Sequence, residues 1–344
     1  MLEEEKPSSR VLGGFEVVDL IGQGGMGSVY LARQISMDRL VALKILSPQL
    51  AKDEKFLERF FREARMSAML NHVHIVQGID VGEAEGFYYF AMEYVEGPTL
   101  AEILRERGRL SERDALRVVL QVAMGLEHAH DRGLIHRDIK PSNIIFSTTE
   151  KVVKLADLGL AKRYVERTGE LTQTGRLVGT PYYMAPELAR GEVVADIRSD
   201  IYSMGATFYH AVTGSPPFEG STPAEILVKH INEPLTPPDQ VNLLLSTGTC
   251  EVIEKMMAKE PKDRYQSPRD VVMDVRRLLA GRPPMLASSS RETELLEQVE
   301  EEPGEVFASP AVTRLSGGDS RIIWGFIIGV VVIILLLLVL LVGG

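Results

Sequence analysis

The sequence predicts an α+β protein with two lobes, a small β-rich lobe with one main helix and a larger helical lobe, followed by one C-terminal transmembrane helix. Strand-like runs rich in β-branched and aromatic residues fill residues 15–95. Helical periodicity dominates residues 96–280. Residues 322–342 are apolar without interruption, which favours a membrane-spanning segment.

Composition excludes several classes of protein. The chain has 344 residues, of which 45% are hydrophobic and 25% charged, so most of it is expected to fold into a packed core. The net charge of −10 argues against nucleic-acid binding, which favours basic surfaces. Cys250 is the only cysteine, so no disulfide forms within the chain, and we expect it to be a core residue.

The small lobe is expected to begin after a flexible lead, residues 1–14. Strands are predicted over residues 15–21, 29–32, 40–46, 75–81 and 87–93. The helix predicted over residues 54–70 would bury one face, because its apolar and small residues recur at helical spacing: Phe56, Phe60, Ala64 and Ser67.

The larger lobe begins where Gly97 and Pro98 interrupt the pattern. Helices are predicted over residues 100–107 and 112–132, short strands over 134–135, 144–146 and 152–156, and further helices between 200 and 280. We therefore place one domain at residues 15–280, divided into lobes of residues 15–95 and 96–280.

The C-terminal region divides into a linker and a membrane anchor. Residues 281–320 are rich in Pro, Ser, Gly and Glu, which predicts a disordered acidic linker. A helix over residues 322–342 would be ~30 Å long, the thickness of a bilayer core. Trp324 lies near one end, where an aromatic ring favours the membrane interface.

A glycine-rich segment follows the first predicted strand. Residues 22–29 fit the pattern G-x-G-x-x-G-x-V, which lets backbone N–H groups approach phosphate oxygens. The pattern leads into a second strand rather than a helix, unlike a dinucleotide-binding fold, and lacks the terminal G-K-[ST] of a Walker loop. Lys44 lies inside the next apolar strand, and because a buried lysine needs a partner, Glu63 on the inward face of the helix is predicted to pair with it.

Residues 136–143 (HRDIKPSN) place an acid, a cation and an amide within a short loop. Asp138 is suited to accept a proton from an attacking hydroxyl, Lys140 to screen a moving phosphoryl group, and Asn143 to hold a metal ion. Asp157 follows a predicted strand and precedes Leu158-Gly159, a position suited to Mg²⁺ that bridges phosphates. A turn or helix-cap role for Asp138 is the structural alternative.

With residues 179–187 (GTPYYMAPE), these motifs make the chain resemble the eukaryotic-like (Hanks-type) Ser/Thr protein kinases, especially the membrane-anchored bacterial type. The resemblance covers about residues 15–280, with the motifs in the family's order. One departure is Leu158, where many kinases have Phe; the two side chains are similar in volume and apolar character.

The resemblance implies a two-lobed protein kinase fold that uses ATP and Mg²⁺, with Mn²⁺ as an alternative metal. It implies that Asp138 is the catalytic base, that Lys140 stabilises the γ-phosphate, and that Lys44, paired with Glu63, contacts the other phosphates. Asn143 and Asp157 would bind the metal ion. The implied ATP-binding set is Ile21, Gly22, Gly24, Gly27, Val29, Ala42, Lys44, Met92, Glu93, Val95 and Ile145.

The resemblance also implies structural and regulatory residues. Arg137 would bind a phosphate on the activation loop, which would be autophosphorylated at Thr172 or Thr174. The structural set would be Thr180, which shapes the substrate platform, Glu187, which pairs with Arg264, and Asp200, which braces the catalytic loop.

The implied partners are proteins with Ser/Thr acceptors, and no nucleic acid. The span 322–342 would tether a cytoplasmic kinase domain to the cell membrane in a single pass. Gly325 and Gly329 form a G-x-x-x-G pattern that favours a homodimer and phosphorylation in trans. The alternatives are a membrane-tethered pseudokinase scaffold, which would be expected to lack one of the catalytic groups, and a small-molecule kinase of related fold.

Overall fold

The computed structural model describes residues 11–157, 181–192 and 196–288. The chain forms two compact units, Met1–Thr293 and Glu294–Gly344, and all described residues lie in the first. Most of the predicted linker and the whole predicted span 322–342 lie outside the described residues. Within the described ranges, no helix is long and apolar enough to cross a membrane.

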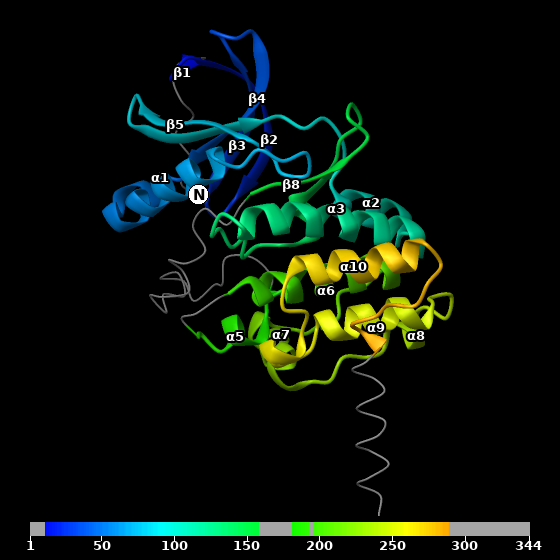
Figure 1. Ribbon diagram of the computed structural model, residues 1–344. Helices are drawn as coiled ribbons and strands as arrows, with labels where there is room; N and C mark the ends of the chain where they lie inside the picture. Colours follow the sequence, from blue (N-terminus) through cyan, green and yellow to red (C-terminus); the bar gives the residue numbers. More distant parts are fainter. Residues whose placement is uncertain (1–10, 158–180, 193–195, 289–344) are drawn as a thin grey trace, which may run out of the picture. The chain divides into compact units, whose positions relative to one another are not determined.

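The small lobe is built on a six-stranded antiparallel sheet (Figure 1) in the order β1-β2-β3-β4-β6-β5. Its strands are β1 Val11–Leu12, β2 Phe15–Gly24, β3 Gly27–Gln34, β4 Arg39–Leu46, β5 Gly78–Ala84 and β6 Phe87–Glu93. The predicted strands are thus confirmed, although the run at residues 75–81 becomes a strand only at Gly78. The expectation of a flexible lead over residues 1–14 is wrong for its last part, because Leu12 is buried and pairs with Phe15.

Helix α1, Glu54–Ala68, packs against this sheet. Asp53 begins the helix, since its side chain accepts a hydrogen bond from the Phe56 N–H. A short 3₁₀ helix, Leu50–Lys52, precedes it. The buried face is the predicted one: Phe56, Phe60, Ala64 and Ser67. The helical spacing in the sequence therefore identified the inward face that also carries Glu63.

The larger lobe is helical, and its core lies between α3, α6, α9 and α10 (Figure 1). Its helices are α2 Leu100–Arg107, α3 Glu112–His130, α5 Pro186–Ala189, α6 Ile197–Thr213, α7 Pro223–Asn232, α8 Pro238–Val241, α9 Thr247–Met256 and α10 Pro268–Leu279, with 3₁₀ turns at Pro141–Asn143 and Pro261–Asp263. Side-chain caps set several starts, for example Thr99 and Glu102 in a capping box at α2. Cys250 is fully buried in this core, as predicted.

Between α3 and α5 the chain forms a small hairpin, β7 Ile144–Phe146 with β8 Val153–Leu155. The strand predicted at residues 134–135 is absent from the described structure. Leu134 instead packs in a small cluster with Leu70, Ile75 and Ala129, so side-chain burial rather than strand pairing holds it. Asp138, Lys140 and Asn143 lie just before the hairpin, and Asp157 lies just after it.

Candidate active site

The catalytic-loop residues surround the Asp138 carboxylate. Lys140 Nζ lies 2.9 Å from Asp138 Oδ2, and the Asn143 side-chain amide donates to Asp138 Oδ2 at 3.2 Å and to its backbone oxygen at 2.7 Å. The Asp138 side chain keeps 17% of its surface exposed, so an incoming hydroxyl can reach it. The cation and the amide singled out in the sequence, Lys140 and Asn143, therefore both contact the carboxylate of Asp138.

Asp200 of α6 binds the backbone of the loop that carries Asp138. It is fully buried, and its two carboxylate oxygens accept hydrogen bonds from the N–H groups of His136, at 2.8 Å, and Arg137, at 2.7 Å. Arg137 has a φ of 62°, a left-handed conformation that a non-glycine residue adopts only when its surroundings stabilise it. His130 Nε2 lies 2.9 Å from the same carboxylate. Asp200 thus fixes the backbone one residue before Asp138.

His136 joins the loop to the strand that leads to Asp157. Its Nε2 contacts the Ala156 carbonyl at 3.1 Å, and its Nδ1 accepts from the Asp138 N–H at 3.2 Å. A carbonyl can only accept and an N–H can only donate, so the ring is neutral with its proton on Nε2. Complete burial lowers the pKa of His136 and keeps it neutral.

The predicted Lys44–Glu63 ion pair is not formed in this structure, although both residues are described. Lys44 Nζ instead lies 2.7 Å from Asp157 Oδ1. Glu63 does lie on the α1 face turned toward the sheet, with one carboxylate oxygen buried. The lysine of β4 is buried, as expected, and the carboxylate after β8 provides its partner.

Asp157 follows β8 with a φ of 56°, so the carboxylate sits at a left-handed turn in the backbone. The Ala156 N–H donates to the Asn143 carbonyl at 2.8 Å, which ties the segment before Asp157 to the catalytic loop. The predicted metal ligands Asn143 and Asp157 are therefore held by the same local framework.

The glycine-rich segment forms the turn between β2 and β3, where Gly24 pairs with Gly27. Gly27 has a φ of 138°, and a Cβ there would lie 2.0 Å from the Ile45 carbonyl oxygen, so only glycine fits. A Cβ on Gly24 would meet nothing within 4 Å, so its backbone is open to approach. Ile21 lies at an irregularity of the β2–β3 register and is 45% exposed.

Most of the residues predicted to enclose the adenine belong to the same lobe, and Ile145 of β7 belongs to the larger lobe. Ala42 of β4 and Met92 of β6 are directly opposite each other on neighbouring strands. Both belong to one buried core cluster with Val95. Val29 and Ile145 are partly buried against that cluster. The Glu93 N–H donates to the Gln77 carbonyl at 2.9 Å, so this N–H is not available to a nucleotide.

Glu187 and Arg264 form a buried, bidentate ion pair. Arg264 Nη1 and Nη2 donate to the two Glu187 oxygens at 2.8 Å each, and the Ser199 hydroxyl donates to Glu187 Oε1 at 2.6 Å. Burial alone would raise the pKa of Glu187, but the hydrogen bonds and charge of Arg264 hold it below its ordinary value. Thr172, Thr174 and Thr180 lie outside the described residues.

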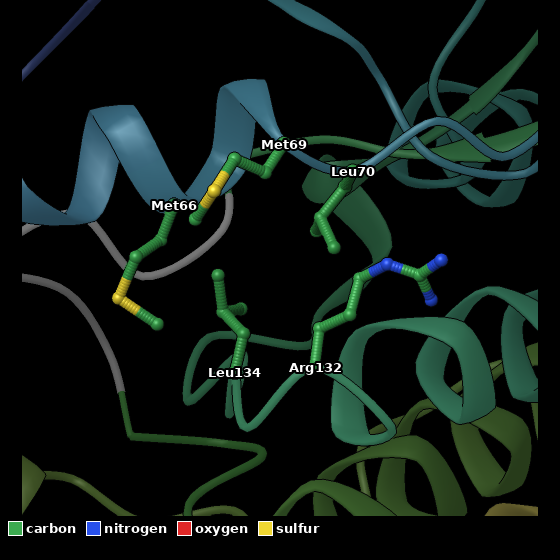
Figure 2. Close-up of a pocket in the computed structure, with 5 residues that line it drawn as sticks. All are labelled: Met66, Met69, Leu70, Arg132 and Leu134. Atoms are coloured by element: carbon green, nitrogen blue, oxygen red, sulfur yellow. The ribbon is translucent and has the colours of Figure 1, made fainter.

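A separate pocket of about 280 Å³ lies where the end of α1 meets the residues before the catalytic loop (Figure 2). Its lining is Met66, Met69, Leu70, Arg132 and Leu134. The stem of Arg132 lines the pocket, while its guanidinium points away from the methionines and contacts the His128 carbonyl. Such an apolar lining does not suit a triphosphate.

Two polar residues near the site were not identified from the sequence. His130 contacts Asp200, and Lys154 of β8 contacts Glu93 at the end of β6. No local pattern identifies His130. Lys154, like Lys44, is a lysine inside an apolar strand, and this pattern could have predicted that it is buried beside an acidic partner.

The comparisons with known proteins agree with this fold. The "Protein kinase domain" family model matches residues 15–274. Serine/threonine-protein kinase PknB of Mycobacterium leprae is 41% identical over 274 residues, which are 78% of this chain and 44% of that protein. The probable serine/threonine-protein kinase CPE1738 of Clostridium perfringens is 38% identical over 83% of this chain and 41% of its own length.

Among solved structures, the Mycobacterium tuberculosis PknI kinase domain superposes with a TM-score of 0.64 at 32% identity, covering 80% of this chain and 100% of that domain. The two-lobed fold has a glycine-rich turn suited to binding phosphates, and a loop that carries Asp138, Lys140 and Asn143. These features define a class of phosphotransferases. The chain belongs to the protein kinase domain family. It spans less than half the length of the curated relatives that it matches.

Proposed function

We propose that this chain is an ATP- and Mg²⁺-dependent protein kinase that phosphorylates Ser and Thr hydroxyls of other proteins. The observation that carries the proposal is the convergence of Lys140 and Asn143 on the Asp138 carboxylate, together with the Lys44–Asp157 pair. The matched relatives are named serine/threonine-protein kinases, which supports the same reaction.

In this reaction Asp138 orients the acceptor hydroxyl and receives its proton. The hydroxyl oxygen bonds to the γ-phosphorus while the bond from that phosphorus to the β–γ bridging oxygen breaks. Lys140, whose Nζ lies 2.9 Å from Asp138 Oδ2, would stabilise the charge on the transferred group. Catalysis would come mainly from positioning and charge stabilisation.

The donor set suits Mg²⁺. The Asn143 amide nitrogen is engaged by Asp138, which leaves the amide oxygen for a metal, and Asp157 supplies a carboxylate that is 34% exposed. Mg²⁺ prefers oxygen ligands and is usually held by one or two protein groups plus substrate phosphates. The metal would neutralise phosphate charge, with Mn²⁺ as an alternative.

Nucleotide binding would use the turn of Gly22, Gly24 and Gly27 for the phosphates, with Lys44 as their cation. Ala42, Val29, Ile21 and Ile145 would enclose the adenine, Met92 would lie behind it, and the Glu93 carbonyl and Val95 backbone would contact its edge. We propose further that Glu63 pairs with Lys44 when nucleotide is bound.

Regulation and location are finer parts of the proposal. Phosphorylation of Thr172 or Thr174, read by Arg137, would switch the activity, and Thr180 would shape the protein-substrate platform. The segment 322–342 would anchor a cytoplasmic kinase domain in the membrane and, through Gly325 and Gly329, favour homodimers. These parts depend on the sequence alone.

Incubation of the full chain in detergent with γ-labelled ATP and a generic protein substrate tests the reaction. We expect labelled phosphoserine and phosphothreonine that depend on Mg²⁺, and a decrease of about 10²- to 10⁴-fold in the Asp138→Asn variant. Labelling unchanged in that variant would refute the assigned base. Nucleotide binding without transfer by the wild type would favour a pseudokinase scaffold.

A further inference from the structure

Lys154 is a buried lysine outside the catalytic set. It lies in β8 with 6% of its surface exposed, and its Nζ donates to Glu93 Oε1 at 2.6 Å. Glu150 Oε2 lies 3.0 Å from the same nitrogen. Burial alone would lower the pKa of Lys154, but its hydrogen bonds to the two glutamates hold that pKa above its ordinary value. The side chain is therefore a fixed cation between two carboxylates.

The two carboxylates differ in what they hold. The Glu150 side chain is 47% exposed and belongs to a loop, whereas Glu93 is the last residue of β6 and its side chain is 26% exposed. The second Glu93 oxygen accepts from the Gln77 N–H at 3.2 Å, and the Glu93 N–H donates to the Gln77 carbonyl. Lys154 thus completes a set of contacts that fixes both the side chain and the peptide of Glu93.

Lys154 also neighbours the predicted floor of the nucleotide pocket. It pairs with Ile145 across the β7–β8 hairpin, so the two side chains share one face of that hairpin. Asp157 follows three residues later in the chain. Lys154 therefore connects β8, which precedes the proposed metal ligand Asp157, with Glu93, which lies close to the junction of the two lobes.

We propose that Lys154 is a positioning residue for nucleotide selection, which holds the Glu93 carbonyl in place to accept a hydrogen bond from the 6-amino group of adenine. The inference rests on the proposed kinase function. A nucleotide with a 6-oxo group, such as inosine triphosphate, has no donor there, so a well-placed carbonyl discriminates against it. Loosening the carbonyl should weaken that discrimination more than it slows the chemistry.

The experiment uses the full chain and measures kcat and KM with ATP and with inosine triphosphate. Lys154→Met removes the cation and keeps an apolar stem of similar length, Lys154→Arg keeps the cation, and Glu150→Gln removes only the exposed partner. For Lys154→Met we expect KM for ATP to rise about tenfold, kcat to stay within about twofold, and the ATP-to-inosine preference in kcat/KM to fall about tenfold. Lys154→Arg and Glu150→Gln should match the wild type.

An unchanged nucleotide preference in Lys154→Met overturns the inference, and so does a fall in kcat with KM unaltered, which would mean that Lys154 acts through Asp157 or the fold. If Lys154→Met does not fold, Glu93→Gln removes the same ion pair and must give the same loss of preference. A wild type that transfers no phosphate refutes the proposed function instead, so the two failures are distinguishable.

Discussion

Lys44 Nζ and Asp157 Oδ1 lie 2.7 Å apart, which links β4 of the small lobe to the residue after β8 across 113 positions of sequence. The pair neutralises a lysine side chain that is only 10% exposed. We propose that both groups act on bound phosphates, Lys44 directly and Asp157 through a metal. The ion pair therefore keeps the Lys44 ammonium and the Asp157 carboxylate together, and a bound triphosphate with its metal would replace this direct contact.

Replacing Lys44 with Met should impair phosphate transfer far more than folding. Loss of a preorganised cation at the phosphates typically costs about 10²- to 10³-fold in rate, and we expect that fall in kcat/KM for ATP. Asp157 is 34% exposed and can be solvated, so the free energy of unfolding should change by only about 1 kcal/mol. Steady-state kinetics and urea denaturation check the two parts.

The matched control is Lys52→Met, which alters an exposed lysine at the end of a 3₁₀ turn. It should leave both measurements unchanged. Full activity in Lys44→Met would contradict the assigned role of the Lys44–Asp157 pair.

Asp200→Asn should reduce both stability and turnover. An amide oxygen can replace only one of the two acceptor oxygens that hold the His136 and Arg137 N–H groups. The left-handed backbone at Arg137 then loses support, and Asp138 follows directly. We expect the free energy of unfolding to fall by about 2 kcal/mol, with a lower kcat.

Urea denaturation and single-turnover transfer measure these effects, with exposed Glu219→Gln as a variant that changes charge by the same amount. An Asp200→Asn protein with wild-type kcat would show that the loop keeps its shape without the second acceptor.

The Glu187–Arg264 pair should behave as a buried unit. Arg264→Met leaves Glu187, which is 3% exposed, without its cation, and should cost about 3–5 kcal/mol of stability. The double variant Glu187→Gln/Arg264→Met removes both charges and should be less destabilised than the sum of its single variants. Chemical denaturation of the four proteins of the cycle measures the coupling, and exposed Arg282→Met is the control.

Additive losses in that cycle would mean that the two residues act separately despite the two 2.8 Å contacts. In that case the pair would not anchor α5 to the loop before α10.

Local patterns were sufficient for most of the fold and for the residues of single motifs. The α1 face followed from apolar spacing, and Asp138, Lys140 and Asn143 lie within one loop, so their convergence required only the octapeptide. Partners across the chain were harder to predict. The sequence predicted Glu63 as the partner of Lys44, whereas in the folded chain Asp157, which follows β8, lies beside it.

The strand predicted at residues 134–135 failed for a related reason. Its apolar residues indicate burial, but a strand also needs a neighbour with free backbone groups. Leu134 finds a side-chain cluster instead. His130 was missed because its role depends on Asp200, 70 positions away in the chain.

Stability should fall as the solution becomes acidic because of a buried histidine. Burial lowers the pKa of His230 to about 4, with the positive charge of Lys259 as a further cause. The ring is neutral near pH 7, and its Nδ1 lies 2.8 Å from the Tyr202 hydroxyl, whose pKa is raised by burial so that it stays protonated and can donate. Protonation of the ring would remove that acceptor.

The direction of the effect follows from proton counting. An unfolded histidine binds its proton near pH 6.5 and the folded one near pH 4, so between these values the unfolded state holds more protons and stability falls as pH falls. The contribution is complete above pH 6.5 and decreases by about 2 kcal/mol by pH 5.0. Burial also lowers the pKa of His136 and His210, which adds to the trend.

Urea denaturation at pH 7.5 and pH 5.0 tests this, with His230→Gln, which keeps a polar side chain but does not titrate. The variant should lose about 2 kcal/mol less stability than the wild type between the two pH values. His72→Gln, at a more exposed histidine whose pKa is also lowered, should reduce the loss by a smaller amount. An identical pH dependence in wild type and His230→Gln would mean that His230 binds its proton at the same pH in the folded and unfolded states, and would refute the lowered pKa assigned to it.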